Sequence, residues 1–232
     1  MAGGNADAVA ASISAFLADK SVPPSRAWLQ SIMQGMKLTT PVKALQNTAL
    51  FRVLAADLQT SLDKAVATAL PPDVTDPTTK ETHVRGPITV QVLDVEDIGR
   101  SRWSQVEAIE AQDRGETTRG REVIRVAPEE TGPDSTAAVD ESKSVGPHKL
   151  LLQDARGTQV FAFEMRPVNG IGVHMSIGAK VVLRDVSVAR GMMLIEPRNL
   201  EILGGKVEAW DKKWREERKQ RLKQMAGMRE GG

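Results

Sequence analysis

The sequence predicts an α+β protein with a mainly β core: an N-terminal three-helix bundle packed on a small five-stranded barrel, followed by a C-terminal helix. Two patterns support this. Over the first 70 residues, apolar side chains recur every three or four positions, as on one face of a helix. From Gly86 onward they alternate with polar residues, as in half-buried strands. A chain of 232 residues is long enough to bury the core that such a fold needs.

Residues 1–70 carry the three predicted helices. Pro23-Pro24 ends the first helix, and the hydroxyl of Ser25 is placed to cap the second. Thr40-Pro41 starts the third, because proline fits the first helical position, and Pro71-Pro72 ends it. The stripes are Val9, Ile13, Phe16 and Leu17; then Trp28, Leu29, Ile32, Met33 and Met36; then Val42, Leu45, Ala49, Val53, Leu54 and Leu58, with a possible continuation through Val66 to Leu70.

Residues 71–85 hold three prolines and four threonines, which predicts an extended linker rather than a packed element. Residues 86–205 form the predicted barrel. At residues 154–157 a turn joins two strands, and Gly157 supplies the positive φ that such turns favour. The predicted strands are 88–93, 149–153, 158–165, 180–188 and 192–196, with 199–203 closing the run.

Residues 100–146 form an insertion between the first two strands of the barrel. Loops longer than about 15 residues are uncommon in compact domains and are usually functional or disordered. Two interpretations remain open: a disordered insertion whose apolar residues pack locally, or a segment that orders on a partner. The second is favoured by apolar anchors in an otherwise polar stretch, namely Trp103, Val106 and Ile109, and then Val123, Ile124 and Val126.

Residues 206–232 follow the Gly204-Gly205 break and predict a charged C-terminal helix. Its apolar stripe (Val207, Trp210, Trp214, Leu222, Met225) is interrupted, because Arg218 and Arg221 lie in the same sector. A solvated helix that is docked only at its start, and a weak phosphate-binding or localisation segment, are both compatible with this pattern.

Composition excludes several classes of site. The formal net charge is +1, so no overall field attracts nucleic acid. The chain has no cysteine and only three histidines, none at metal-ligand spacing, so we expect neither metal nor cofactor. No nucleophile elbow, zinc-protease motif or complete phosphate loop occurs, which predicts that the protein is not an enzyme. We also expect no contact with a membrane, since no apolar run approaches about 18 residues.

A barrel that binds single-stranded nucleic acid is the alternative function. Such barrels stack bases on aromatic side chains of their second and third strands. Aromatic residues make up only 3% of this chain, and Phe161 and Phe163 share one parity with Met165. We expect this set inside the barrel, which would leave an exposed face without an aromatic platform.

Three stretches resemble the RecQ-mediated genome instability protein 1 family. They are Val22-Pro23-Pro24 with Trp28-Leu29, then the run from Ser101 to Val106, and then the most specific one, which runs from Gly191 through Glu196-Pro197-Arg198-Asn199 to Leu203-Gly204-Gly205-Lys206-Val207-Glu208. The resemblance is to short, fungal-type members. It implies that the barrel is an oligonucleotide-binding (OB) fold.

The resemblance also implies a function. It implies a nuclear, non-catalytic scaffold that binds topoisomerase III and a RecQ helicase, with DNA contacted weakly or through the complex. The insertion would reach the enzyme's gate and favour decatenation and dissolution of double Holliday junctions. Trp103 falls at an aromatic contact position of the family and Lys180 at a basic barrel position. The full set predicted to bind the topoisomerase is Trp103, Gln105, Val106, Ile109, Val123, Ile124, Val126 and Lys180.

Overall fold

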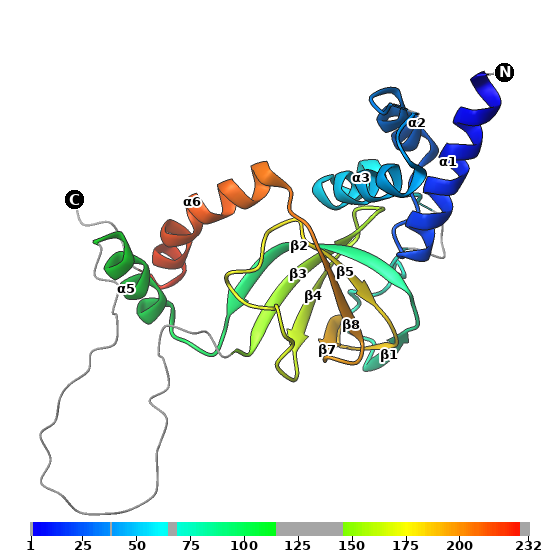
Figure 1. Cartoon of the computed structure of the whole chain (residues 1–232). Coiled ribbons are helices and arrows are strands. Elements are labelled where there is room, and N and C mark those ends of the chain that lie inside the picture. The colour runs from blue at the N-terminus through cyan, green and yellow to red at the C-terminus, as the bar shows by residue number, and fades with distance from the viewer. Residues whose placement is uncertain (1, 38, 65–68, 115–145, 228–232) are drawn as a thin grey trace, which may run out of the picture.

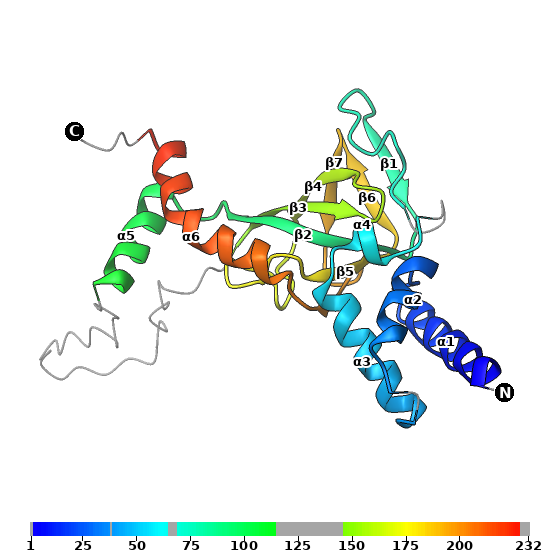
Figure 2. The same cartoon turned by 90° about the horizontal axis from the view of Figure 1, so that it is seen from above.

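The computed structural model describes residues 2–37, 39–64, 69–114 and 146–227 (Figure 1). Within these residues the chain forms N-terminal helices, a curled eight-stranded sheet, and two further helices, α5 (Arg102–Asp113) and α6 (Glu208–Met225). Helix α5 and the C-terminal part of α6 lie together at the end of the sheet away from the N-terminus (Figures 1 and 2). The α+β class and the barrel are confirmed. None of the helices in the described ranges is both long and apolar enough to cross a membrane.

The N-terminal helices begin and end where local chemistry requires it. The Ser25 hydroxyl accepts a hydrogen bond from the Trp28 amide at 3.3 Å, which confirms the predicted cap. The third helix is shorter than its apolar stripe, because the Asp57 carboxylate accepts from the Gln59 amide at 3.0 Å and starts a new helical turn. The helices are α1 (Ala2–Asp19), α2 (Arg26–Gln34), α3 (Val42–Ala55) and α4 (Leu58–Ser61).

The described part of the barrel has eight strands in the spatial order β1-β6-β7-β4-β3-β2-β5-β8. Strands β4 and β7 are parallel, and the other neighbours are antiparallel. The strands are β1 (Glu81–Val84), β2 (Ile88–Asp97), β3 (His148–Asp154), β4 (Gln159–Glu164), β5 (Lys180–Leu183), β6 (Val186–Ala189), β7 (Met192–Ile195) and β8 (Leu200–Gly204).

Two features, together with β8 at the closing residues 199–203, raise the strand number from the predicted five to eight. Part of the expected linker is strand β1, which pairs with β6. Val84 of β1 and Val74, which precedes the strand, are buried in the barrel core. The expectation of an unpacked segment is therefore wrong for these residues. Predicted strand 180–188 is two strands, because Asp185 adopts a φ of 51° and turns the chain between β5 and β6. The predicted turn glycine is confirmed, since Gly157 has a φ of 92°.

Strand β4 has the opposite orientation to the one expected. Val160, Ala162 and Glu164 point inward and are buried, whereas Phe161 is 46% exposed and Met165 is 50% exposed. The expectation that the phenylalanines fill the barrel is wrong. The reason is Glu164, whose carboxylate accepts from the backbone amides of His148 (3.0 Å) and Val168 (2.8 Å) and lies 2.6 Å from the His148 ring. A carboxylate with these partners must face inward, and the pleat then sends Phe161 outward.

A buried polar network joins the helical domain to the barrel. The Gln91 side chain of β2 accepts from the Leu58 amide at 3.0 Å and donates to the carboxylate of Asp57 at 2.8 Å. It also donates to the side-chain oxygen of Gln153 at 3.0 Å, which accepts from Gln59 as well. The start of α4 is therefore fixed to β2 and β3 by hydrogen bonds that water cannot replace.

The chain after β8 touches the helical domain on its other side. Gly205 has a φ of 88°, and a Cβ atom there would lie 2.4 Å from the carbonyl oxygen of Leu54 in α3. Only glycine allows this approach. Leu203 of β8 packs on the apolar core of the helical domain, where Ala155 from the β3–β4 turn is buried. The barrel thus completes the core of the helices.

We expect Gln91→Leu to lower the free energy of unfolding by about 2 kcal/mol, because it leaves the buried Leu58 amide without its side-chain acceptor and removes one hydrogen bond to Asp57. Urea unfolding monitored by tryptophan fluorescence measures this loss. Gln159→Leu, at an exposed position of β4, is the matched control and should change stability by less than about 0.5 kcal/mol. Equal losses in both variants would contradict the role of the network.

Candidate partner-binding site

The insertion leaves the barrel through helix α5. The Ser101 hydroxyl caps this helix by accepting from the Ser104 amide at 3.1 Å. The buried Gln105 side chain donates to the carbonyl oxygens of Asp97 (2.9 Å) and Arg100 (3.1 Å). Val106 is also buried. Two of the predicted contact residues, Gln105 and Val106, therefore hold α5 against the end of β2.

The other predicted residues on α5 lie differently. Trp103 is 56% exposed, and Ile109 is half-buried. An indole ring this exposed on a helix that is fixed at its base is available to a partner at little conformational cost. The predicted anchors Val123, Ile124 and Val126 lie outside the described residues.

Trp214 is the centre of the contact made by α6. Its ring is buried, and its Nε1 donates to the Asp94 carboxylate on β2. The guanidinium carbons of Arg218 and Arg221 lie 5.6 and 5.5 Å from the ring centroid, and that of Arg215 lies 6.0 Å away. The arginines that interrupt the apolar stripe of α6 thus stack around its tryptophan. The sequence did not predict this contact, because an arginine within an apolar stripe is usually taken to interrupt the buried face of a helix.

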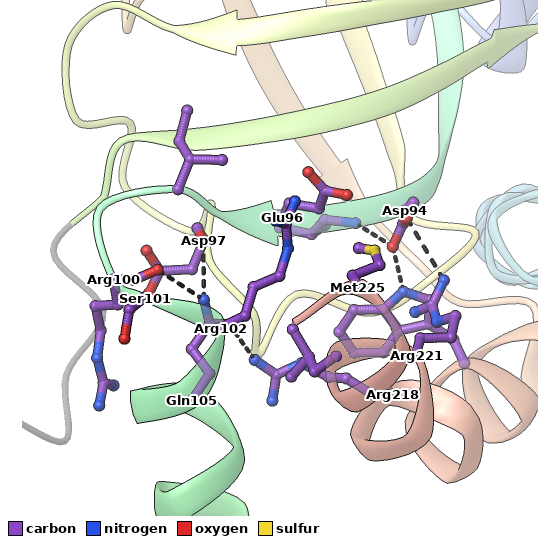
Figure 3. Close-up of a pocket in the computed structure, with 14 residues that line it drawn as sticks. Asp94, Glu96, Asp97, Arg100, Ser101, Arg102, Gln105, Arg218, Arg221 and Met225 are labelled. Atoms are coloured by element: carbon purple, nitrogen blue, oxygen red, sulfur yellow. Dashed lines mark hydrogen bonds and ion pairs between the residues drawn. The ribbon is translucent and has the colours of Figure 1, made fainter. Parts of the chain in front are cut away.

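A cleft of about 340 Å³ lies between β2, α5 and α6 (Figure 3). Arg218 donates to the Gln105 side chain at 3.1 Å, and Arg221 lies 3.5 Å from the carboxylate of Asp94. Burial holds the pKa of the Arg218 guanidinium below its usual value, and the nearby Asp97 opposes that shift. At the cleft, α6 is therefore joined to α5 by the hydrogen bond from Arg218 and to β2 by the ion pair of Arg221.

Ion pairs connect α5 to the far end of α6. Lys223 lies 2.8 Å from Glu110, and Lys219 lies 3.0 Å from Asp113 and 3.6 Å from Glu110. The hydrogen bond from Lys223 lowers the pKa of Glu110, and the hydrogen bond to Asp113 raises the pKa of Lys219. These basic residues of the C-terminal helix are therefore engaged by α5. Sequence reasoning missed this pairing, although acidic and basic residues recur at three- to four-residue spacing on the two helices.

Lys180 does not lie where its predicted role requires. A residue that binds a partner must be accessible to it, but the Lys180 side chain is completely buried and its ammonium donates to the Gly178 carbonyl at 2.6 Å. The nearest charge that acts on it is the Asp57 carboxylate of the helical domain. Burial lowers the pKa of Lys180 to about 8, and the Asp57 carboxylate partly opposes the shift.

Comparison with known proteins gives concordant matches. Residues 70–218 match the model described as RMI1, N-terminal OB-fold domain, and residues 17–61 match RMI1, N-terminal helical domain. RecQ-mediated genome instability protein 1 of Schizosaccharomyces pombe is 26% identical over 86% of this chain and 89% of that protein. The protein of the same name from Xenopus laevis is 28% identical over 78% of this chain but only 30% of its own length.

A helical domain fixed to a curled barrel, with an appended helix pair, defines an OB-fold protein of two joined parts. The OB-fold match covers more than half of the chain and includes α5 and most of α6. The chain belongs to the RecQ-mediated genome instability protein 1 family. The resemblance found in the sequence is thereby confirmed.

The buried lysine predicts a pH dependence of stability. The unfolded chain holds the Lys180 proton with a pKa near 10.5 and the folded chain with one of about 8, so the unfolded state binds more protons between these values. The free energy of unfolding therefore rises with pH over this window, by about 3 kcal/mol. The chain has no Tyr or Cys to titrate there.

We expect Lys180→Met to abolish this rise in urea unfolding series between pH 7.5 and 10.5. Lys149→Met, which removes a partly exposed lysine of β3, is the control and should keep it. A rise that persists unchanged in the Lys180 variant would contradict the assignment.

The ion pairs predict how firmly α5 is held. Glu110→Lys faces Lys219 and Lys223 with a like charge, so we expect the α5 amides to exchange with solvent roughly three- to tenfold faster. Hydrogen–deuterium exchange measures this. The double variant Glu110→Lys/Lys223→Glu should restore protection, and Glu107→Lys on the exposed face of α5 should leave it unchanged. No acceleration, or the same acceleration in both single variants, would mean that the pairs do not fix the helix.

Proposed function

We propose that this protein is a non-catalytic nuclear scaffold that binds topoisomerase III through the OB barrel and its insertion. In this proposal it modulates the enzyme's gate and so promotes decatenation and dissolution of double Holliday junctions together with a RecQ helicase. Membership in a family named for RecQ-mediated genome instability supports the part of the proposal that involves a RecQ helicase. The observation that carries the binding role is Trp103, which is 56% exposed on a helix held rigidly at the base of the insertion.

In this proposal, the residues of α5 have two roles. Trp103 and Ile109 are contact residues, because their side chains are open or partly open to solvent. Gln105 and Val106 are positioning residues, since their buried side chains set the direction of α5. Val123, Ile124 and Val126 remain predicted contacts from the sequence. Lys180 acts on the joint between barrel and helices rather than on the partner.

Hydrophobic burial of a few anchors would supply most of the affinity, as hot spots generally do. The effect on the gate is then differential binding: the scaffold shifts the open–closed equilibrium only as far as it prefers one state. Helix α5 must be firmly attached to the barrel for this effect, because contact residues on a freely moving helix would bind the open and closed states of the gate equally well. The contacts of Trp214 and Arg218 with β2 and α5 provide that attachment.

The non-catalytic part of the proposal is supported by membership in this family of OB-fold proteins. In the cleft between β2, α5 and α6, Arg221 contacts the carboxylate of Asp94. The strongly shifted lysine, Lys180, is buried at the joint between the helices and the barrel.

A second candidate is a barrel that binds single-stranded DNA. The outward orientation of Phe161 favours it, because OB barrels use rings on this face for stacking. The salt dependence of binding distinguishes the two candidate functions. Binding through the phosphate backbone weakens steeply between low and moderate salt, whereas an interface anchored by apolar residues does not.

Calorimetric titration of topoisomerase III with the intact chain, paired with a decatenation assay, tests the proposal. We expect Trp103→Ala to weaken binding about 30-fold or more, the loss typical of a buried aromatic anchor. Glu107→Ala, on the same helix, is the control. A chain whose residues 115–145 are replaced by a short Gly/Ser linker separates affinity from gating.

Each result has a definite meaning. Retained binding with a lost effect on decatenation would assign affinity to the barrel and α5, and gating to the insertion. If the linker variant matches the intact chain in both assays, the gating mechanism is wrong. An intact chain that does not bind would overturn the scaffold function and leave DNA binding to be tested.

A further inference from the structure

The outer surface of three adjacent strands is apolar. It consists of outward-pointing side chains of β3, β4 and β7 and of the residue that follows β4, all exposed or half-exposed. We call it the outer apolar face; its members are Leu151, Phe161, Phe163, Met165, Met192 and Leu194. Phe161 and Met165 are among the most exposed large apolar side chains of the described residues.

Strand register makes this surface continuous. Phe161 lies opposite Leu151 on one side and Met192 on the other. Phe163, two residues along β4, lies opposite Lys149 and Leu194. Side chains at paired positions on one face of a sheet are in contact distance. The six residues therefore form one patch rather than scattered exposed side chains.

The fold itself does not need these side chains outside. The inward positions of β4 are taken by Val160, Ala162 and Glu164, which complete the barrel interior. Within the described part of the chain, no helix covers the outer apolar face (Figures 1 and 2). Contiguous exposed apolar surface of this kind marks an interaction site in soluble proteins.

The charges at the border of the face indicate its partner. Lys149 forms an ion pair with Glu96 at 2.9 Å, and its ammonium lies 4.8 Å from the centroid of the Phe161 ring. The lysine is thus neutralised and held by its neighbours. A phosphate backbone needs basic groups that are free to bind it, and the lysine beside Phe161 is already engaged. An uncharged apolar protein surface matches the face, since aromatic residues and Met are enriched in protein interfaces.

The face is continuous with the base of the insertion. Glu96, which pairs with Lys149 in the strand register, lies two residues before Ile98. Ile98 is 43% exposed, and its amide donates to the Pro147 carbonyl at 3.0 Å, where the chain returns from the insertion. A partner that contacts α5 and the insertion therefore lies close to the border of the outer apolar face at Glu96 and Lys149.

We propose that the outer apolar face is the surface through which the barrel itself docks on topoisomerase III, and that the enzyme presents an uncharged apolar patch to it. This inference rests on the proposed function. It adds a second contact area to Trp103, formed by the sheet instead of the insertion. Two contact areas on one rigid body would fix the angle at which the insertion approaches the enzyme.

The test is titration of topoisomerase III from the same organism with the wild-type chain, Trp103→Ala and three further variants, at two salt concentrations. We expect Phe161→Asp/Met165→Asp to weaken binding at least about 30-fold, because two carboxylates would be buried against an apolar patch. Phe161→Ala/Met165→Ala should weaken it about tenfold without adding charge. The matched control is Phe51→Asp on α3, which changes a phenylalanine that is 75% exposed on the helical domain. Circular dichroism and thermal unfolding establish that each variant folds.

Three results would overturn the inference. Equal binding by the wild-type chain and the double variants, with Trp103→Ala still weakened, would overturn it while leaving the proposed function intact. Equal losses in the Phe51 control and the double variants would mean that the effect is not specific to the face. A wild-type chain that does not bind the enzyme would overturn the proposed function, and this inference with it.

A labelled oligothymidine probe tests whether the outer apolar face binds single-stranded nucleic acid instead of a protein. We expect no change in its binding when the face is altered. Salt-sensitive oligothymidine binding that is lost in Phe161→Ala/Met165→Ala, with topoisomerase binding unchanged, would assign the face to single strands instead.

Discussion

The side chain of Gln91 is the contact on which the arrangement of the molecule depends. It sits in the middle of β2, the strand that pairs with both β3 and β5, and it satisfies the first amide of α4 and the Asp57 carboxylate together. Buried polar groups with all partners in place tolerate only one geometry, since any shift leaves a group unsatisfied. The helical domain and the barrel therefore behave as one body, with Lys180 enclosed at their joint.

The C-terminal end of β2 holds the candidate binding site. Asp94 binds Trp214 of α6, and Asp97 binds Gln105 of α5, so one strand organises both this site and the contact with the helical domain. Helix α6 is rich in charge, which from the sequence alone suggested a solvated or phosphate-binding segment. Its arginines stack on Trp214 instead, and Lys223 contacts Glu110. The C-terminal helix thus supports the base of the insertion through four of its basic residues, Arg218, Lys219, Arg221 and Lys223.

Two exposed apolar side chains lie near ion pairs. Trp103 on α5 and Phe161 on the sheet are open to solvent, while Lys149 pairs with Glu96 and Lys219 pairs with Glu110. Such a surface favours association with a protein over association with a polyanion, because charged side chains that are already matched release little free energy on meeting phosphate. The two apolar areas on one rigid frame are suited to orienting a large partner.

The sequence by itself determined the α+β class, the caps and turns at Ser25 and Gly157, and the family, because these depend on local periodicity, short motifs and backbone preference. The tertiary structure alone decided which way each strand faces and which charges meet. The parity of β4 was set by Glu164, whose partners lie on β3 and beyond β4, and no local pattern contains them. In the same way Lys180 became a buried residue, since burial depends on what packs above a strand and not on the residues beside it.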